Sequence, residues 1–118
     1  MDNNALDRAI ATFMEPEPAL RTARKGDISS GRFWEWHSTV DYGTLLGEWK
    51  PRSHREPEVA MKLLKDLNKG GVLTIGKQEI DAFAQWFVGV HTRPFEFAGE
   101  LEDAIALAFV KANGLEVE

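Results

Sequence analysis

The sequence predicts an α+β fold, with one small antiparallel β-sheet of about three or more strands packed with three α-helices in a single layered domain over residues 1–118. Three observations support this fold class. Apolar residues recur at helical spacing near residues 4–14, 55–69 and 100–112. Short β-branched and aromatic runs lie between residues 72 and 98. The length of 118 residues is typical of one domain, and 43% hydrophobic with 28% charged residues is typical of a globular chain.

Three helices are predicted from apolar stripes and from residues that begin or end helices. The first ends before Pro16, and the weakly patterned residues 19–32 are expected to form an exposed loop. The second begins after a capping box of Ser53 and Glu56 and ends at two glycines. The third has an acidic first turn, which suits the positive end of a helix dipole. The apolar stripe of the first helix consists of Leu6, Ala9, Ile10 and Phe13, and that of the second consists of Val59, Ala60, Leu63, Leu64 and Leu67. In the third helix the acidic residues are Glu100, Glu102 and Asp103, and the apolar face consists of Leu101, Ala104, Ile105, Ala108, Phe109 and Ala112.

Two short strands are expected on either side of a longer one. Residues 72–75 are β-branched and predict the first, with a turn at residues 76–79. The last short strand follows Pro94. In it, alternation places Phe95 and Phe97 toward the core and Glu96 outward.

The longer strand spans about residues 83–90. Both of its faces are fairly apolar, which predicts a central strand covered on both sides. A helix over residues 77–86 is the alternative, since the apolar residues there also fit a helical face.

Composition limits the classes of protein to which the chain can belong. It has no cysteine, so disulfides and thiolate metal sites are excluded and a reducing cytoplasm is the expected location. No apolar run approaches the roughly 18 residues that cross a bilayer, and the polar start differs from a signal peptide. We therefore expect no membrane association.

The net charge of −5 is unevenly distributed. Residues 1–20 carry −3, residues 21–69 carry +3 and residues 70–118 carry −5. General nucleic-acid binding is not expected of an acidic chain, because phosphate contacts need clustered cations. Docking on a basic protein surface is compatible with this charge.

Residues 32–55 carry an unusual number of aromatic side chains. Trp34 and Trp36 would share one face of a strand, and either a short hairpin or an extended loop fits the pattern. Together with Tyr42 and Trp49 they form the first candidate binding surface, because Trp and Tyr are enriched at interface hot spots. The alternative is that these rings fill the core beneath a long loop.

A basic group precedes the second helix. It consists of Lys50, Arg52, His54 and Arg55, and its ordinary interpretation is a solvated start of a helix. Cations at a helix N-terminus could also bind a phosphate, so Arg52, His54 and Arg55 are the second candidate binding group. No Gly-rich loop accompanies them.

No catalytic residues and no cofactor are predicted. The three histidines are far apart and none has a partner at metal-ligand spacing, so no metal site is predicted. The chain has no Gly-x-Ser-x-Gly motif. Glu100, Glu102 and Asp103 are interpreted as partners of the helix dipole.

Three segments carry a resemblance to a known family: residues 6–11, residues 49–67 with Trp49 and Ser53, and residues 102–112 with the pattern Ala-Ile-x-x-Ala. The chain resembles the small phage proteins with an alpha-beta-alpha (ABA) sandwich domain. It departs from them where Ser53 is followed by two basic residues in place of threonine and aspartate. The resemblance implies a layered fold, phage or prophage origin and an accessory role, and it implies no catalytic residues.

The first functional hypothesis is a non-enzymatic phage or prophage protein that binds a host or phage protein, in its most concrete form an inhibitor of a bacterial defence system (anti-CRISPR-like). The alternative is a binder of a nucleotide or phosphate that uses the basic group and a tryptophan. A minor enzyme is the third hypothesis and requires a concave pocket with converging acid and base groups. The sequence does not identify the partner or the oligomeric state.

Overall fold

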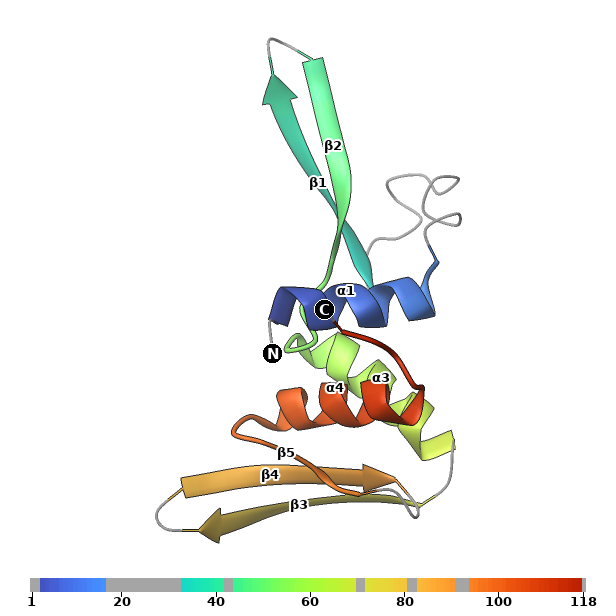
Figure 1. Ribbon diagram of the computed structural model, residues 1–118. Helices are drawn as coiled ribbons and strands as arrows, with labels where there is room; N and C mark the ends of the chain where they lie inside the picture. Colours follow the sequence, from blue (N-terminus) through green and yellow to red (C-terminus); the bar gives the residue numbers. More distant parts are fainter. Residues whose placement is uncertain are drawn as a thin grey trace. The chain divides into compact units, whose positions relative to one another are not determined.

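The structure is a computed structural model that describes residues 3–16, 33–41, 44–69, 72–80, 83–90 and 94–117. Within these ranges the chain has three helices and two small antiparallel sheets, which confirms the predicted α+β class (Figure 1). The elements in chain order are α1 (Asn3–Met14), β1 (Trp34–Asp41), β2 (Thr44–Pro51), α3 (Pro57–Lys69), β3 (Leu73–Ile80), β4 (Phe83–Val90), β5 (Glu96–Ala98) and α4 (Leu101–Ala112).

The chain divides into two compact units. The first comprises Met1–Ser53 with Val117–Glu118 and contains α1, β1 and β2; the second comprises His54–Glu116 and contains the other elements. The prediction of one domain over residues 1–118 stays a prediction. None of the described helices is long and apolar enough to cross a bilayer.

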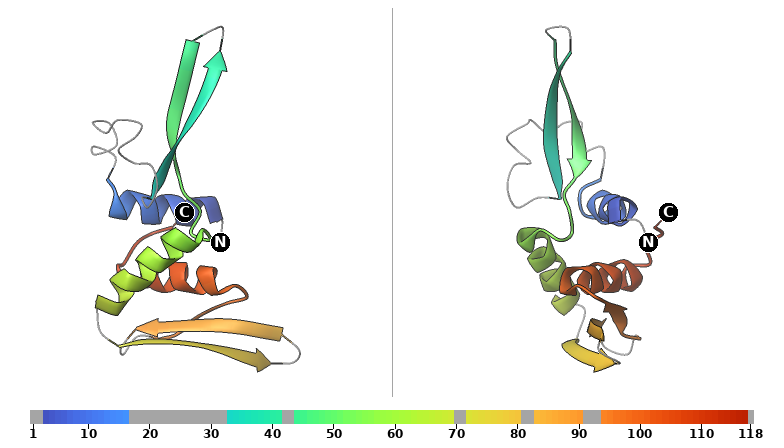
Figure 2. Two further views of the ribbon diagram at one scale, coloured as in Figure 1. Left: turned by 180° about the vertical axis from the view of Figure 1, so that it is seen from behind. Right: turned by 90° about the vertical axis from the view of Figure 1, so that its left-hand side faces the viewer.

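The first unit joins helix α1 to a two-stranded hairpin. Strands β1 and β2 pair antiparallel from Trp34 opposite Pro51 to Asp41 opposite Thr44, so the hairpin alternative for this segment is the one that forms. Helix α1 forms where it was predicted and lies across the base of the hairpin (Figures 1 and 2). Phe13 was assigned to the buried face, but it is 45% exposed because it lies in the last turn of the helix.

Trp34 fastens the hairpin to α1. Its indole Nε1 donates hydrogen bonds to the carbonyl oxygens of Ala11 at 3.1 Å and Glu15 at 3.0 Å. The backbone N–H of Phe33 donates to Oε1 of Glu15 at 2.6 Å. These acceptors lie at the end of α1, and the carbonyl oxygen of Ala11 also accepts the backbone N–H of Glu15 at 2.8 Å. Trp34 is thus both the first residue of β1 and a hydrogen-bond donor to backbone carbonyls at the end of α1.

The second unit is a three-stranded sheet with helices on one face (Figure 2). Its strand order is β3-β4-β5, so β4 is central as predicted and the alternative helix over residues 77–86 does not form. The predicted turn at residues 76–79 is wrong, since these residues continue β3 and pair with β4. Gly76 lies opposite Phe87, and the missing side chain makes room for that ring, which the sequence pattern alone did not indicate.

Both described helices of the second unit lie on one face of this sheet (Figure 2). Helix α4 packs against β4, β5 and α3, and Val88, Ile105 and Phe109 are each at most 1% exposed. The prediction that β4 is covered on both sides is wrong, because α3 and α4 lie on the same side. Phe95 and Phe97 face away from the helices and are 47% and 44% exposed, which reverses their predicted orientation.

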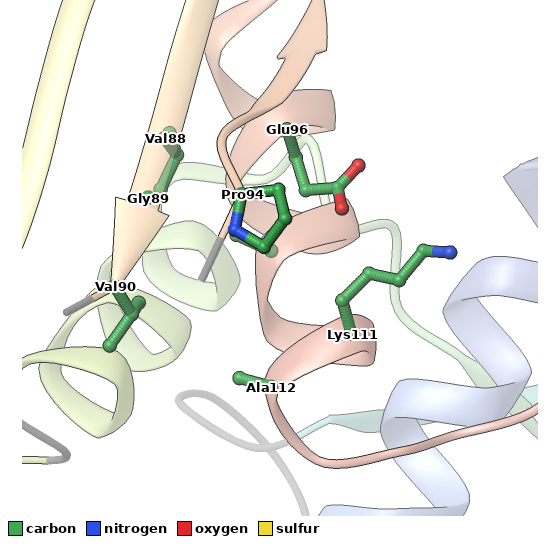
Figure 3. A pocket seen from close by; sticks show the side chains of 8 residues that line it. Val88, Gly89, Val90, Pro94, Glu96, Lys111 and Ala112 are labelled. Carbon is green, nitrogen blue, oxygen red and sulfur yellow. The ribbon is translucent and has the colours of Figure 1, made fainter. Parts of the chain in front are cut away.

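A small hollow lies where β4, β5 and α4 meet (Figure 3). Glu96 lines it beside Pro94 and Lys111, so this glutamate belongs to the helix side of the sheet and does not face outward as predicted. The hollow holds about 10 Å³, which is room for a single water molecule at most. It is too small to receive a substrate or cofactor.

Candidate functional sites

The β1–β2 hairpin has one apolar face and one polar face. Residues opposite each other in an antiparallel pair share a face, and the faces alternate along each strand. Trp36 and Trp49 lie opposite each other on one face. Glu35 opposite Lys50 and His37 opposite Glu48 lie on the other face.

Trp36 and Trp49 form the centre of the apolar face. Their ring centroids are 5.1 Å apart at an interplanar angle of 74°, an edge-to-face arrangement that aromatic pairs favour. The Trp36 ring also lies over Gly47, where a Cβ atom would collide with it. Both rings are only partly buried. The glycine thus allows one indole to lie flat on the sheet and present its other side outward.

The polar face carries two ion pairs between residues two apart on one strand. Nε2 of His37 lies 2.8 Å from Oε1 of Glu35, and Nζ of Lys50 lies 3.5 Å from Oε1 of Glu48. All four side chains are well exposed, so each pair contributes little to stability. This face is a solvated surface.

The other predicted residues of the aromatic group have different surroundings. Trp34 is 4% exposed and its indole N–H is bonded to α1, so it is a structural residue rather than a contact surface. Tyr42 lies outside the described residues. Arg52 donates its backbone N–H to the carbonyl oxygen of Phe33 at 2.8 Å, which continues the hairpin by one bond beyond Pro51.

His54 and Arg55 both contact Asp103 in the first turn of α4. Nε2 of His54 lies 2.5 Å from Oδ1 of Asp103, and His54 is 1% exposed. Arg55 donates from Nε to Oδ1 at 3.0 Å and from Nη2 to Oδ2 at 2.8 Å. The three residues form a clamp between the segment before α3 and the start of α4.

The clamp changes the acidity of its carboxylate. The Arg55 guanidinium, supported by His54, lowers the pKa of Asp103 below its ordinary value of 3.8, against the opposing effect of burial. Asp103 therefore stays ionised and holds both basic side chains. The sequence identified His54 and Arg55 as a group but missed Asp103, which it assigned to the helix dipole alone. No local signal links residues 48 positions apart.

The outward face of the β3–β4–β5 sheet is a second aromatic surface, which the sequence did not predict. Phe87 lies 5.2 Å from Phe95 and 6.0 Å from Phe97, measured between ring centroids. Gly76 lies beneath the Phe87 ring and Gly89 beneath the Phe95 ring. Apart from these, the face holds the uncharged register positions Thr74, Gln78 and Gln85.

The described residues offer no metal-binding cluster beside these candidate sites, since they contain no group of three potential metal ligands. No protein-family model matches this chain, and no curated protein or solved structure matches it either.

Proposed function

We propose that the protein acts by binding a protein partner through the apolar face of the β1–β2 hairpin. The observation that carries this proposal is the partly exposed Trp36–Trp49 pair, which lies on a sheet of only two strands. Two-stranded hairpins are marginally stable in water unless their apolar face packs on something. A partner that covers these rings would gain the binding energy that tryptophan typically provides at hot spots.

The finer proposal is that the protein is a phage or prophage accessory protein whose partner belongs to a bacterial defence system. The resemblance to the phage proteins with an ABA sandwich domain supports it, together with the acidic net charge of −5, which favours encounter with a basic surface. A partner that binds nucleic acid, as defence effectors do, would present such a surface.

A small-ligand role has weaker support. A phosphate held by His54 and Arg55 would have to compete with Asp103, whose two carboxylate oxygens already accept hydrogen bonds from Arg55. Calorimetry against a panel of nucleotides and inorganic phosphate tests this alternative. Binding that is lost in Arg55→Ala but kept in Trp36→Ala would favour the ligand role over the protein partner.

The protein-partner proposal is tested by capture and then by affinity. Purified protein is used to capture partners from bacterial lysates, and each candidate is titrated with the wild type, Trp36→Ala and Trp49→Ala. Loss of a hot-spot tryptophan costs about 2–4 kcal/mol, so the dissociation constant is expected to rise roughly 30-fold to 1000-fold. His37→Ala and Lys50→Ala, on the opposite face of the same strands, are the matched controls and should bind within about threefold of wild type.

Equal affinity of the tryptophan variants and the controls would refute the hairpin as the contact surface. The finer proposal has its own readout, the plating efficiency of a phage on a strain with an active defence system. Expression of the wild-type protein is expected to raise it, and expression of Trp36→Ala is not. A partner that binds through the tryptophans without any effect on defence would refute the finer proposal alone.

A further inference from the structure

Strand β3 has one side that no other strand of the described ranges uses. It is the outer strand of the order β3-β4-β5, and its eight residues form a long edge for so small a sheet. Ile75 is 40% exposed there, and Lys77 and Glu79 are exposed. An edge of this kind presents backbone N–H and C=O groups that can pair with another strand.

The charges of β3 are complementary to a second copy of the same strand. Lys77 and Glu79 lie two residues apart and therefore on one face of the strand. In a two-fold antiparallel pairing centred on Gln78, Lys77 of each copy lies directly opposite Glu79 of the other. Opposite charges in directly opposed positions stabilise a strand pair, whereas like charges destabilise it.

The neighbouring two-fold registers do not have this complementarity. Centring the pair on Lys77 or on Glu79 places two like charges directly opposite each other. Centring it on Gly76 places Ile75 opposite Lys77 and leaves Glu79 opposite Leu73. The charges therefore favour the register centred on Gln78 over its neighbours. A shift to another register would change every opposed pair of residues.

In a single copy the side chain of Lys77 lies toward Trp86 on the neighbouring strand β4, and it would turn to the outer edge in the pairing. Its Nζ lies 5.5 Å from the centroid of the Trp86 ring, over the helix side of the sheet. A lone lysine on an edge strand normally discourages strand addition. In the proposed pair, Glu79 of the second copy would neutralise the charge of Lys77. The lysine would therefore disfavour pairing with an unrelated strand but not pairing with β3 of a second copy.

We propose that the protein forms a homodimer by antiparallel pairing of β3 with β3 of a second copy, centred on Gln78. Residues 76–80 of the two copies would pair, with Ile80 of each copy opposite Gly76 of the other, and the two sheets would join into one of six strands. The phenylalanine clusters of Phe87, Phe95 and Phe97 from the two copies would then lie on the same face of one sheet. This assembly uses the second unit and is independent of the hairpin surface.

Charge reversal tests the register. Sedimentation velocity of the full chain over a concentration series should show a dimer for the wild type. Lys77→Glu and Glu79→Lys should each raise the dimer dissociation constant at least about tenfold, because each replaces two attractive pairs by two repulsive ones. The double variant Lys77→Glu/Glu79→Lys restores opposite charges and should restore the dimer. Circular dichroism checks that each variant keeps the wild-type fold.

Disulfide cross-linking tests the same pairing without changing a charge. The chain has no cysteine, so Gln78→Cys can only cross-link two copies to each other. Directly opposed residues place their Cα atoms about 4.5–5.5 Å apart, within the range of a disulfide. Gln85→Cys is the matched control, since Gln85 lies opposite Gln78 on the central strand β4, about three strand spacings or 14 Å from its copy.

Oxidation should convert Gln78→Cys to a covalent dimer and leave Gln85→Cys monomeric under denaturing conditions. Together with restoration by the double reversal, this result supports the pairing. A wild-type protein that stays monomeric up to about 1 mM overturns it. So does a dimer that neither charge reversal weakens, or equal cross-linking of the two cysteine variants.

Discussion

The two sheets of this protein share a packing device and differ in how they are covered. In both, an aromatic ring lies over a glycine of a neighbouring strand: Trp36 over Gly47 in the hairpin, and Phe87 over Gly76 in the three-stranded sheet. A ring laid on a glycine compensates for the side chain that the glycine lacks. Both sheets thereby present flat aromatic area on one face.

The difference lies in the opposite face and in the number of strands. The three-stranded sheet buries Val88 and Val90 on its helix side, where α4 packs against β4. The hairpin has two strands, and its fastening to α1 is concentrated at Trp34. Within each unit, buried residues on one side or at the base hold the unit together, and the partly exposed rings lie apart from them.

The largest expected effect concerns the covered face of the second unit. Phe109→Ala removes a ring that is 0% exposed and should cost about 3–5 kcal/mol in the free energy of unfolding, because a cavity replaces it. Phe97→Ala, on the outward face where the ring is 44% exposed, should cost about 1 kcal/mol or less. Urea denaturation measures both. Similar costs for the two would mean that the outward face is as well packed as the core.

The next effect concerns the base of the hairpin. Trp34→Ala should destabilise the protein by about 3 kcal/mol, since it removes a buried ring and leaves the carbonyl oxygens of Ala11 and Glu15 without this donor. Trp36→Ala should cost about 1 kcal/mol, the scale of one cross-strand pair. Thermal unfolding followed by circular dichroism compares the two. A Trp36 variant as unstable as the Trp34 variant would show that the hairpin pair belongs to the core.

A smaller effect is expected at the clamp. Asp103→Asn should cost about 1–3 kcal/mol, because buried His54 and the Arg55 guanidinium lose a charged acceptor. Glu100→Gln is the control: Glu100 precedes the same helix and makes no side-chain cap hydrogen bond, so its change should stay within about 0.5 kcal/mol. Urea denaturation at neutral pH compares the variants.

The clamp also predicts a pH dependence with a definite sign. The pKa of Asp103 in the folded protein lies below its ordinary value of 3.8. Its contribution to stability is therefore complete above the unfolded pKa and disappears as pH falls through the lowered folded pKa. The difference in stability between wild type and Asp103→Asn should shrink as the pH falls below about 4. A difference that grows below that pH would contradict the clamp.

The smallest expected changes in the free energy of unfolding concern the two glycines that lie beneath aromatic rings. Gly76→Ala should cost about 1–2 kcal/mol, because the new Cβ would collide with Phe87, which is held between Phe95 and Phe97. Gly47→Ala should cost about 1 kcal/mol or less, since the partly exposed Trp36 ring can turn away. Gly99→Ala, where a Cβ meets no atom within 4 Å, is the control. Partner binding should fall in Gly47→Ala and not in the other two.

The helices and the central strand could be predicted from the sequence because their signals are local. Apolar spacing, proline and glycine act within a few residues, and α1, α4 and β4 lie where these signals placed them. Helix α3 begins at Pro57, later than the capping box at Ser53 predicted, because residues 54–56 form a turn before the helix. The hairpin was one of two open alternatives, since its pairing joins residues up to 17 positions apart, Trp34 with Pro51. The aromatic group was identified by composition, which cannot distinguish Trp34 in the core from Trp36 at the surface.

The fold class, the approximate helix positions and the concentration of aromatic residues before α3 could be predicted from the sequence alone. Only the tertiary structure decided which rings are covered, that residues 76–79 extend a strand, and that Asp103 holds His54 and Arg55. The physical reason is that periodicity reports two faces of an element but not which face receives a packed layer. Both faces of β4 are apolar, and the placement of α4 on one of them left Phe87, Phe95 and Phe97 on the other.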